Sequence, residues 1–277
     1  MLKCVTVECI PTLIQLKRSV HAVYCAAMRR YGLPVDEETV KRAYAHGFKT
    51  TQMKYPNFGV GSDGVMKYYK DWWRVSVYET LNAPGMPANG WSKDEFELFF
   101  QDVFSEFGSV NTWQAQPDAK DFLQQCQKAG LITGLLDNSY GRYIDDTLPL
   151  CDALHEALHF SVLGAEYDPP LLKPNAAAFQ EALRKANIVG KMLKEGVVGE
   201  IAPDEMLHIG NRLNVDYAGA LGAGCKAIIL DRSGSVVKDK LMKGAIDFTK
   251  LGCKLTTEDV VGSLSEALGL MRDRGYL

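Results

Sequence analysis

Short apolar runs that alternate with helical stretches restrict the fold of this 277-residue chain more than any other feature of its sequence. Four such runs lie beyond residue 116: Leu131–Leu136, His159–Leu163, Met206–Ile209 and Lys226–Leu230. Apolar runs without polar alternation are typical of strands that are buried on both faces of a sheet. Because helical stretches separate the runs, and because such crossovers are right-handed, we predict an α/β fold with a doubly wound, Rossmann-like parallel sheet.

A long helical segment separates the first predicted strand from the later ones. Leu2–Ile10 is short, rich in Val and Cys and followed by Pro11, which predicts a buried strand. The chain then shows no comparable strand up to residue 108, and helices are expected over Val20–Met28, Glu37–Phe48, Met66–Leu81 and Lys93–Phe107, with Asp36 and Ser92 as N-caps. We therefore predict a core domain of residues 1–13 and 114–277 and an inserted α-helical cap domain of residues 14–113.

Charge and composition argue against two classes of function. The chain has 34 acidic and 31 basic residues, so its net charge of −3 provides no basic field, and we expect no direct nucleic-acid binding. No apolar run approaches the roughly 18 residues that cross a bilayer, so we expect no membrane insertion. Seven cysteines without CxxC spacing indicate free thiols in an intracellular reducing compartment, either cytoplasm or mitochondrial matrix.

Three conspicuous patterns are interpreted as structural. Gly59–Gly64 matches GxGxxG, but no strand precedes it, so we expect a plain turn. His208 lies within an apolar run and is expected to be a core histidine with satisfied hydrogen bonds. An aromatic quartet at helical spacing is expected to pack in the core of the cap domain; it consists of Tyr68, Tyr69, Trp72 and Trp73.

Polar residues follow the predicted strands at several places. The first strand ends in Glu8-Cys9-Ile10-Pro11-Thr12, and the second ends in Asp137-Asn138-Ser139. Later in the chain Lys173-Pro174 opens a helix, and Gly210-Asn211 leads to Asp216. The carboxyl ends of strands in an open parallel sheet share one crevice. We therefore expect these residues to meet there.

This order of motifs resembles the haloacid dehalogenase (HAD) superfamily, with its DxDxT, Ser/Thr, Lys and GDxxxxD stations and a helical cap after the first strand. The likeness extends along nearly the whole chain through Tyr55–Gly59, Asp71–Trp73, Thr112–Gln114, Leu172–Pro174 and Phe179–Leu183. It implies a HAD-like fold with a helical cap. It also implies an ancestral Mg²⁺-dependent hydrolase site.

Four positions depart from the family pattern. Glu8 stands in place of the nucleophilic Asp, and its extra methylene displaces the carboxylate by about 1 Å. Ile10 replaces the general acid and base and cannot carry a proton. Asp137 replaces the Ser or Thr that donates a hydrogen bond to a phosphoryl oxygen, unless the strand ends so that Ser139 serves. Asn211 replaces the acid that binds Mg²⁺ and is a poorer ligand for a hard dication.

Three positions match the family: Thr12, Lys173 and Asp216. Beside Glu8 and Asp137, Lys173 can pair with both carboxylates in a closed polar cluster. We therefore predict a catalytically inactive HAD-like protein, a pseudoenzyme, with no catalytic residues, bound metal or cofactor. Its expected role is that of a structural or adaptor subunit bound to other proteins in a larger assembly, through the segment 187–203, a C-terminal helix over 255–277 or the surface of the cap.

Two other functions remain open at this point. The first is a Mg²⁺-dependent HAD-type phosphatase or hydrolase that uses Glu8 as a displaced nucleophile or base. Its metal ligands would be Glu8, the backbone of Ile10, Asn211 and Asp216. The second is a non-catalytic sensor that keeps the cleft and binds a phosphorylated ligand.

Overall fold

The computed structural model describes residues 1–60, 68–88, 90–193, 199–234 and 237–277, which divide into two compact units. The first unit consists of Met1–Gln15, Ala115–Gly164 and Leu171–Leu277. The second consists of Leu16–Gln114 and Ala165–Pro170. The division from sequence keeps residues 165–170 with the core, whereas the structure places this short segment in the second unit.

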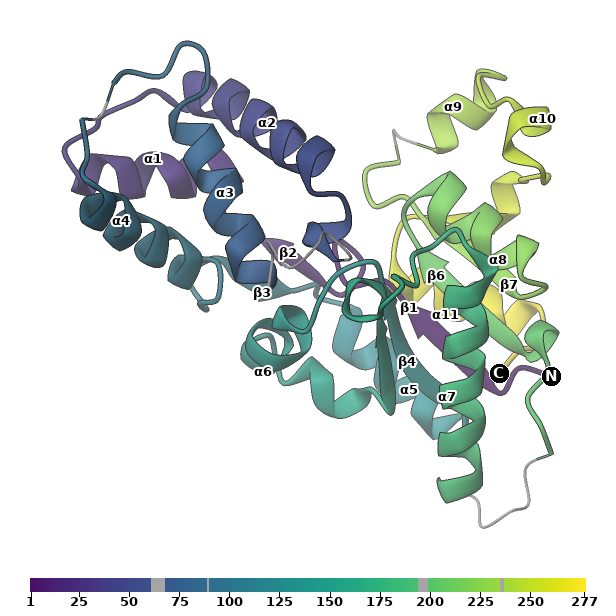
Figure 1. Ribbon diagram of the computed structural model, residues 1–277. Coiled ribbons are helices and arrows are strands. Elements are labelled where there is room, and N and C mark those ends of the chain that lie inside the picture. The colour runs from purple at the N-terminus through teal and green to yellow at the C-terminus, as the bar shows by residue number, and fades with distance from the viewer. Residues whose placement is uncertain (61–67, 89, 194–198, 235–236) are drawn as a thin grey trace. The chain divides into compact units, whose positions relative to one another are not determined.

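A six-stranded sheet forms the centre of the first unit (Figure 1). Its order is β5-β4-β1-β6-β7-β8, and the neighbouring pairs are parallel. The strands are β1 (Cys4–Val7), β4 (Ile132–Asp137), β5 (Phe160–Leu163), β6 (Met206–Gly210), β7 (Lys226–Leu230) and β8 (Val260–Val261). After β1 the chain adds β4 and β5 on one side of β1 and then β6, β7 and β8 on the other side. The direction in which strands are added therefore reverses beside β1. The predicted doubly wound α/β sheet is confirmed.

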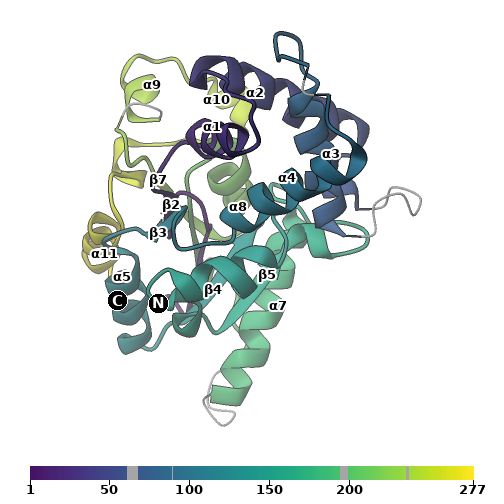
Figure 2. The same ribbon diagram turned by 90° about the vertical axis from the view of Figure 1, so that its left-hand side faces the viewer.

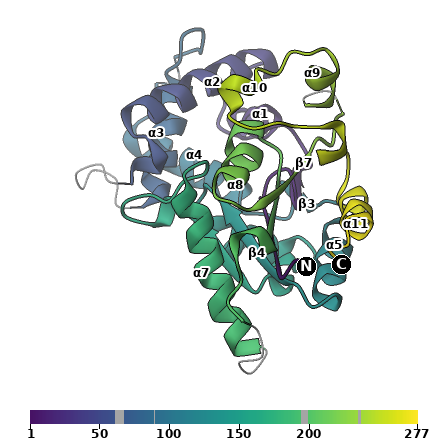
Figure 3. The same ribbon diagram turned by 90° about the vertical axis from the view of Figure 1, so that its right-hand side faces the viewer.

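The helices of the first unit are α5 (Ala119–Lys128), α6 (Leu148–Leu150), α7 (Ala176–Leu193), α8 (Ala218–Gly222), α9 (Lys238–Met242), α10 (Phe248–Leu251) and α11 (Leu264–Asp273). Four of them cover the two faces of the sheet. Figure 3 shows α7 and α8 on one face and α5 and α11 on the other. Phe122 of α5 and Phe179 of α7 are fully buried, as expected of helices that cover a sheet with two apolar faces.

The longest helix of the first unit corrects one expectation. The sequence suggests a helix that ends near residue 186 and a patternless segment from 187 to 203. In the structure α7 continues to Leu193, because Gly190 does not end it but lies against the sheet. A Cβ at Gly190 would meet the side chain of Ile132 at 3.3 Å. Residues 194–198 of the segment lie outside the described residues.

The C-terminal region is also not the single helix expected over 255–277. It contains the short strand β8 and then α11, which begins after Ser263. The side chain of Ser263 accepts a hydrogen bond from the backbone N–H of Glu266, so it acts as an N-cap within the expected helix. A two-residue strand is too short to show a periodic pattern in the sequence.

The second unit is built from α1 (Val20–Arg30), α2 (Glu37–Lys54), α3 (Tyr69–Leu81) and α4 (Lys93–Glu106), as Figure 2 shows. The predicted N-caps are confirmed, since Asp36 accepts from Thr39 N–H and Ser92 from Glu95 N–H. A second sheet of two strands pairs β2 (Ile14–Leu16) with β3 (Trp113–Ala115). The sequence does not reveal β2, because three residues are too few to show alternation.

The aromatic quartet of the second unit packs only in part as expected. Trp72 is fully buried, and its indole meets the phenyl ring of Phe58 and the indole of Trp73 edge to face. Tyr68, at the N-cap of α3, is 72% exposed. Most of the Gly59–Gly64 motif lies outside the described residues; Gly59 itself ends a turn at Asn57–Gly59. In the described parts of the chain, no helix combines the length and the apolar character that crossing a membrane requires.

Candidate functional site

The candidate site lies at the carboxyl ends of three adjacent strands of the first unit. Glu8 follows β1, Asp137 is the last residue of β4, and Asn211 follows β6. Because β1 pairs with both β4 and β6, these three residues meet where the strand order reverses. We use the name carboxyl-edge cluster for these residues and the side chains they gather: Glu8, Asp137, Lys173, His208, Asn211, Arg212 and Asp216.

A buried ion pair joins Lys173 to Asp216. Lys173 Nζ donates to Asp216 Oδ1 at 2.6 Å, and the two side chains are 0% and 1% exposed. The other carboxylate oxygen, Oδ2, accepts from the backbone N–H of Arg212 at 2.8 Å. Asp216 reaches this position because Gly210 has no side chain, since a Cβ there would lie 2.4 Å from Asp216 Cγ. Both oxygens of Asp216 are therefore engaged within the chain.

His208 contacts both members of this ion pair. Its Nε2 lies 3.3 Å from both Lys173 Nζ and Asp216 Oδ1, and its Nδ1 lies 2.9 Å from Thr6 Oγ1. Thr6 and His208 are direct partners in the β1–β6 register, which explains the last contact. Burial lowers the pKa of His208, and the nearby ammonium lowers it further. The sequence identifies a core histidine but does not show that it contacts the cluster.

Glu8 is buried, and both of its carboxyl oxygens have partners. Oε2 accepts from the backbone N–H of Asn211 at 3.3 Å, and Oε1 lies 3.4 Å from Arg212 Nη2. Lys173 Nζ is more distant, at 3.9 Å from Oε1. Glu8, which occupies the family's nucleophile position, is thus held by Asn211 and Arg212, the two residues that follow β6.

The protonation state of Glu8 is set mainly by burial. Burial raises the pKa of its carboxyl to about 8, and the carboxylates of Asp216 and Asp137 also raise it. The cationic groups of Lys173 and Arg212 oppose this rise but do not outweigh it. At neutral pH Glu8 is therefore mostly protonated, and a protonated carboxyl is a poor nucleophile and a poor ligand for a cation.

For Asp216 the balance is reversed. Burial also opposes its ionisation, but the ammonium of Lys173 and the contact with His208 outweigh burial and hold the pKa of Asp216 well below its usual range. The cluster therefore contains one neutral and one ionised carboxyl group at neutral pH. These environments keep Asp216 as the permanent counter-ion of Lys173.

Asp137 anchors two strand ends through its carboxylate. Oδ2 accepts from the backbone N–H of Cys9 at 3.0 Å, and Oδ1 accepts from that of Ser139 at 2.9 Å. The structure therefore places Asp137, rather than Ser139, at the end of β4. A carboxylate in this position repels a phosphate group rather than donating a hydrogen bond to it.

The partners of Lys173 match those expected from sequence only in part. Among the described residues its ammonium pairs with Asp216 and lies 3.9 Å from Glu8 Oε1, as expected for Glu8, but no ion pair joins it to Asp137. Its backbone is fixed by Asn138, whose side chain donates to Lys173 C=O at 2.8 Å and accepts from Lys173 N–H at 2.7 Å. The sequence gives no sign of this amide clamp beyond the presence of Asn138 at a strand end.

Three polar atoms around the cluster have no hydrogen-bond partner within the described chain: Thr12 Oγ1, Ser139 Oγ and Asn211 Oδ1. Thr12 and Ser139 are buried residues, and leaving a buried polar group unpaired costs about 1–3 kcal/mol unless water or a ligand satisfies it. Ile10 is half-buried and provides no side-chain donor or acceptor.

The residues present do not fit the Mg²⁺ ion that the resemblance implies. Its expected ligands are Glu8, the backbone of Ile10, Asn211 and Asp216. Both oxygens of Asp216 and both oxygens of Glu8 already accept hydrogen bonds or contact cations of the chain. What remains is a neutral amide and a backbone carbonyl, whereas Mg²⁺ prefers carboxylate oxygens and water. Within the described ranges, no three His, Cys, Asp or Glu side chains gather as metal ligands.

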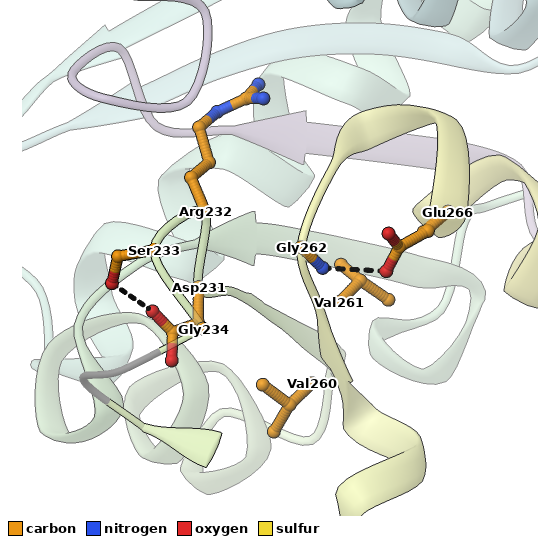
Figure 4. A pocket seen from close by; sticks show the side chains of 8 residues that line it. All are labelled: Asp231, Arg232, Ser233, Gly234, Val260, Val261, Gly262 and Glu266. Atoms are coloured by element: carbon orange, nitrogen blue, oxygen red, sulfur yellow. Dashed lines mark hydrogen bonds between the residues drawn. The ribbon is translucent and has the colours of Figure 1, made fainter. Parts of the chain in front are cut away.

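A separate pocket of about 230 Å³ lies at the carboxyl ends of β7 and β8 (Figure 4). It is lined by Asp231, Arg232, Ser233, Gly234, Val260, Val261, Gly262 and Glu266. Its charged side chains are engaged within the chain, since Asp231 accepts from Val237 N–H and Glu266 from Gly262 N–H. Arg232 points away from Val260, as Figure 4 shows. The guanidinium donates to the carbonyl of Thr12 at 2.9 Å and forms two hydrogen bonds with Asp118.

Comparisons with known proteins agree with the fold described above. A family model described as haloacid dehalogenase-like hydrolase matches residues 12–224. Haloacid dehalogenase-like hydrolase domain-containing protein 3 of Mus musculus is 26% identical over 235 residues, which are 84% of this chain and 84% of that protein.

Two solved structures share the fold. They are 2-haloacid dehalogenase from Pseudomonas syringae pv. Tomato DC3000 (TM-score 0.62, 19% identity, 99% of this chain and 100% of that chain) and L-2-haloacid dehalogenase from Xanthobacter autotrophicus (TM-score 0.57, 16% identity, 98% and 99%). At these identities the similarity concerns the fold alone. Because the family model covers well over half of the sequence, the chain belongs to the haloacid dehalogenase-like hydrolase family.

Proposed function

We propose that this chain is a catalytically inactive member of its family, a pseudoenzyme. The observation that carries the proposal is the state of Glu8, which occupies the nucleophile position. It is buried, both its oxygens have partners, and burial raises its pKa to about 8. A nucleophile must be ionised and free to approach the substrate.

Two further residues support inactivity. Ile10 cannot transfer a proton, and the loss of general acid–base catalysis typically costs about 10²–10⁴ in rate. Lys173, which would offset charge on a phosphate group, is bound to Asp216 at 2.6 Å. Such losses do not add, because catalytic groups act as a unit. Together they leave the standard phosphoryl or haloacid chemistry without an attacking group or a proton donor.

A hydrolysis assay tests this proposal. The purified full chain is incubated with a panel of phosphate monoesters and 2-haloacids, with and without Mg²⁺, beside Glu8→Gln. We expect no turnover above background, and therefore no difference between the two proteins. Glu266→Gln, the same substitution outside the cluster, serves as the matched control. Mg²⁺-dependent turnover that is abolished by Glu8→Gln but kept by Glu266→Gln would contradict inactivity and establish the hydrolase that uses Glu8.

For the role of the inactive fold, we propose a structural or adaptor subunit in a larger protein assembly. We place the contact surface near the end of α7. Three apolar side chains are exposed there, namely Ile188, Met192 and Leu193 at 44%, 76% and 56%. Clustered exposed apolar side chains are typical of protein–protein contacts. With a net charge of −3, protein subunits rather than nucleic acids are the expected partners.

Native size measurement in an extract of the source cells tests the adaptor role. The chain is expected to migrate well above the 30.7 kDa of the free protein. Met192→Lys places a charge on the α7 surface, and much of this variant is expected to migrate at the size of the free protein. Met242→Lys is the control, because Met242 is 74% exposed on another helix. Migration of the unmodified chain as a free monomer would refute the adaptor role.

We also propose an intracellular reducing compartment, cytoplasm or mitochondrial matrix. The thiols support this proposal: Cys4, Cys9 and Cys126 are fully buried, and burial raises the pKa of Cys126 to about 12. A protonated, inaccessible thiol is a structural apolar group rather than part of a disulfide framework.

A further inference from the structure

Arg212 provides a cation beside the two carboxyl groups that the family resemblance assigns to metal binding. Its Nη2 lies 3.4 Å from Glu8 Oε1, and its backbone N–H donates to Asp216 Oδ2 at 2.8 Å. The side chain is about half exposed, at 51%, so it reaches the buried cluster from the surface. One residue thus engages an oxygen of each carboxyl group.

The neighbouring position strengthens this effect. Asn211 directly precedes Arg212 and carries an amide where the family pattern has an acid. Its backbone N–H donates to the second oxygen of Glu8 at 3.3 Å. Compared with the family pattern, Asn211 therefore removes one negative charge from the end of β6, and Arg212 places one positive charge there. Both changes weaken the attraction of the site for a divalent cation.

The carboxyl groups of the cluster already have cations of the chain beside them. Lys173 Nζ lies 2.6 Å from Asp216 Oδ1, and Arg212 Nη2 lies 3.4 Å from Glu8 Oε1. A divalent ion would bring two further positive charges next to these cations. Like charges at such distances repel, and they do so most strongly in a buried site.

We infer that Arg212 takes the place of a divalent cation in this cluster, so that the site binds no Mg²⁺ or Mn²⁺ while Asn211 and Arg212 are present. The inference concerns the same cluster as the proposed inactivity. Either can fail without the other, since a metal-independent hydrolase would satisfy this inference and an inactive protein that binds metal would not.

Mn²⁺ titration of the full chain tests the inference, with free Mn²⁺ followed by electron paramagnetic resonance and the melting temperature measured in parallel. The wild-type chain is expected to show no saturable binding below the millimolar range and no rise in melting temperature with Mn²⁺. The variant Asn211→Asp/Arg212→Met restores a carboxylate at position 211 and removes the guanidinium that lies beside Glu8. We expect it to acquire one saturable site, with an affinity at least about tenfold higher than that of the wild type.

The matched control is Asn214→Asp/Arg212→Met. It has the same formal charge, but the new carboxylate stands at an exposed position three residues along the chain. Equal Mn²⁺ affinity of the two double variants would overturn the inference, because the effect would then be nonspecific. If the first variant does not fold, the wild-type titration decides: saturable one-to-one binding that is lost in Glu8→Gln refutes the role of Arg212, and its absence supports it.

Discussion

Lys173→Met is expected to lower the free energy of unfolding by about 3–5 kcal/mol, the typical cost of removing one partner from a buried ion pair. The substitution keeps much of the volume of the side chain but leaves the carboxylate of Asp216 without the ammonium at 2.6 Å. Asp216 is 1% exposed, so water cannot replace the lost partner without opening the strand end. Urea denaturation at pH 7, followed by circular dichroism, measures the loss.

Two further variants make this prediction specific. Lys41→Met removes one member of an exposed pair with Glu38, at 3.4 Å, and is expected to cost less than about 1 kcal/mol. Lys173→Met/Asp216→Asn removes both charges and should destabilise the chain by clearly less than the sum of the two single changes. A loss for Lys173→Met as small as that for Lys41→Met would show that the buried pair does not stabilise the fold.

Glu8→Gln is expected to stabilise the protein increasingly as the pH rises from 6 to 9. The folded-state pKa of Glu8 is about 8, against an ordinary value near 4.5 in the unfolded chain. Between these values the folded chain holds a proton that the unfolded chain has released, so wild-type stability decreases as the pH rises through this window. A full unit of such a shift corresponds to about 1.4 kcal/mol. Gln cannot titrate, so the variant escapes this loss, and the difference between the two proteins should level off above pH 8.

The same denaturation curves, recorded at pH 6, 7, 8 and 9, measure this trend. Glu95→Gln is a useful comparison, because hydrogen bonds from Ser92 lower the pKa of Glu95. Its contribution to stability is present above its unfolded-state pKa and is lost only in acid, so its effect should not change between pH 6 and 9. If the Glu8→Gln difference is also constant over this range, Glu8 is already ionised in the folded protein and the basis of the proposed inactivity is removed.

The elements that sequence patterns predicted well are those specified by local physics. The strand expected at Met206–Ile209 extends over Met206–Gly210, and the N-cap roles of Asp36 and Ser92 follow from side chains that bond to their own helices. The α7 helix extended beyond the expected end because Gly190 packs against Ile132, a contact that depends on tertiary structure. β8 has only two residues and shows no local signal.

For the candidate site, strand order brought the expected positions to one edge, but their pairing could not be predicted. Whether Lys173 meets Asp137 or Asp216 depends on side-chain direction and on Gly210, which opens the space that Asp216 fills. The place of His208 in the cluster depends on the pairing of β1 with β6, which sets Thr6 opposite His208. Arg212 gives no signal in the sequence beyond its position next to Asn211.

The contacts that hold Glu8 have a consequence for how this sequence can change over generations. Ile10→Asp or Asn211→Asp, each a single step toward the family motif, would add a negative charge near the carboxyl groups that Lys173 and Arg212 already contact. Such a step lowers stability before it adds any catalytic group. For an inactive protein of the kind we propose, recovery of a hydrolase would then require several coordinated replacements rather than one mutation at a time.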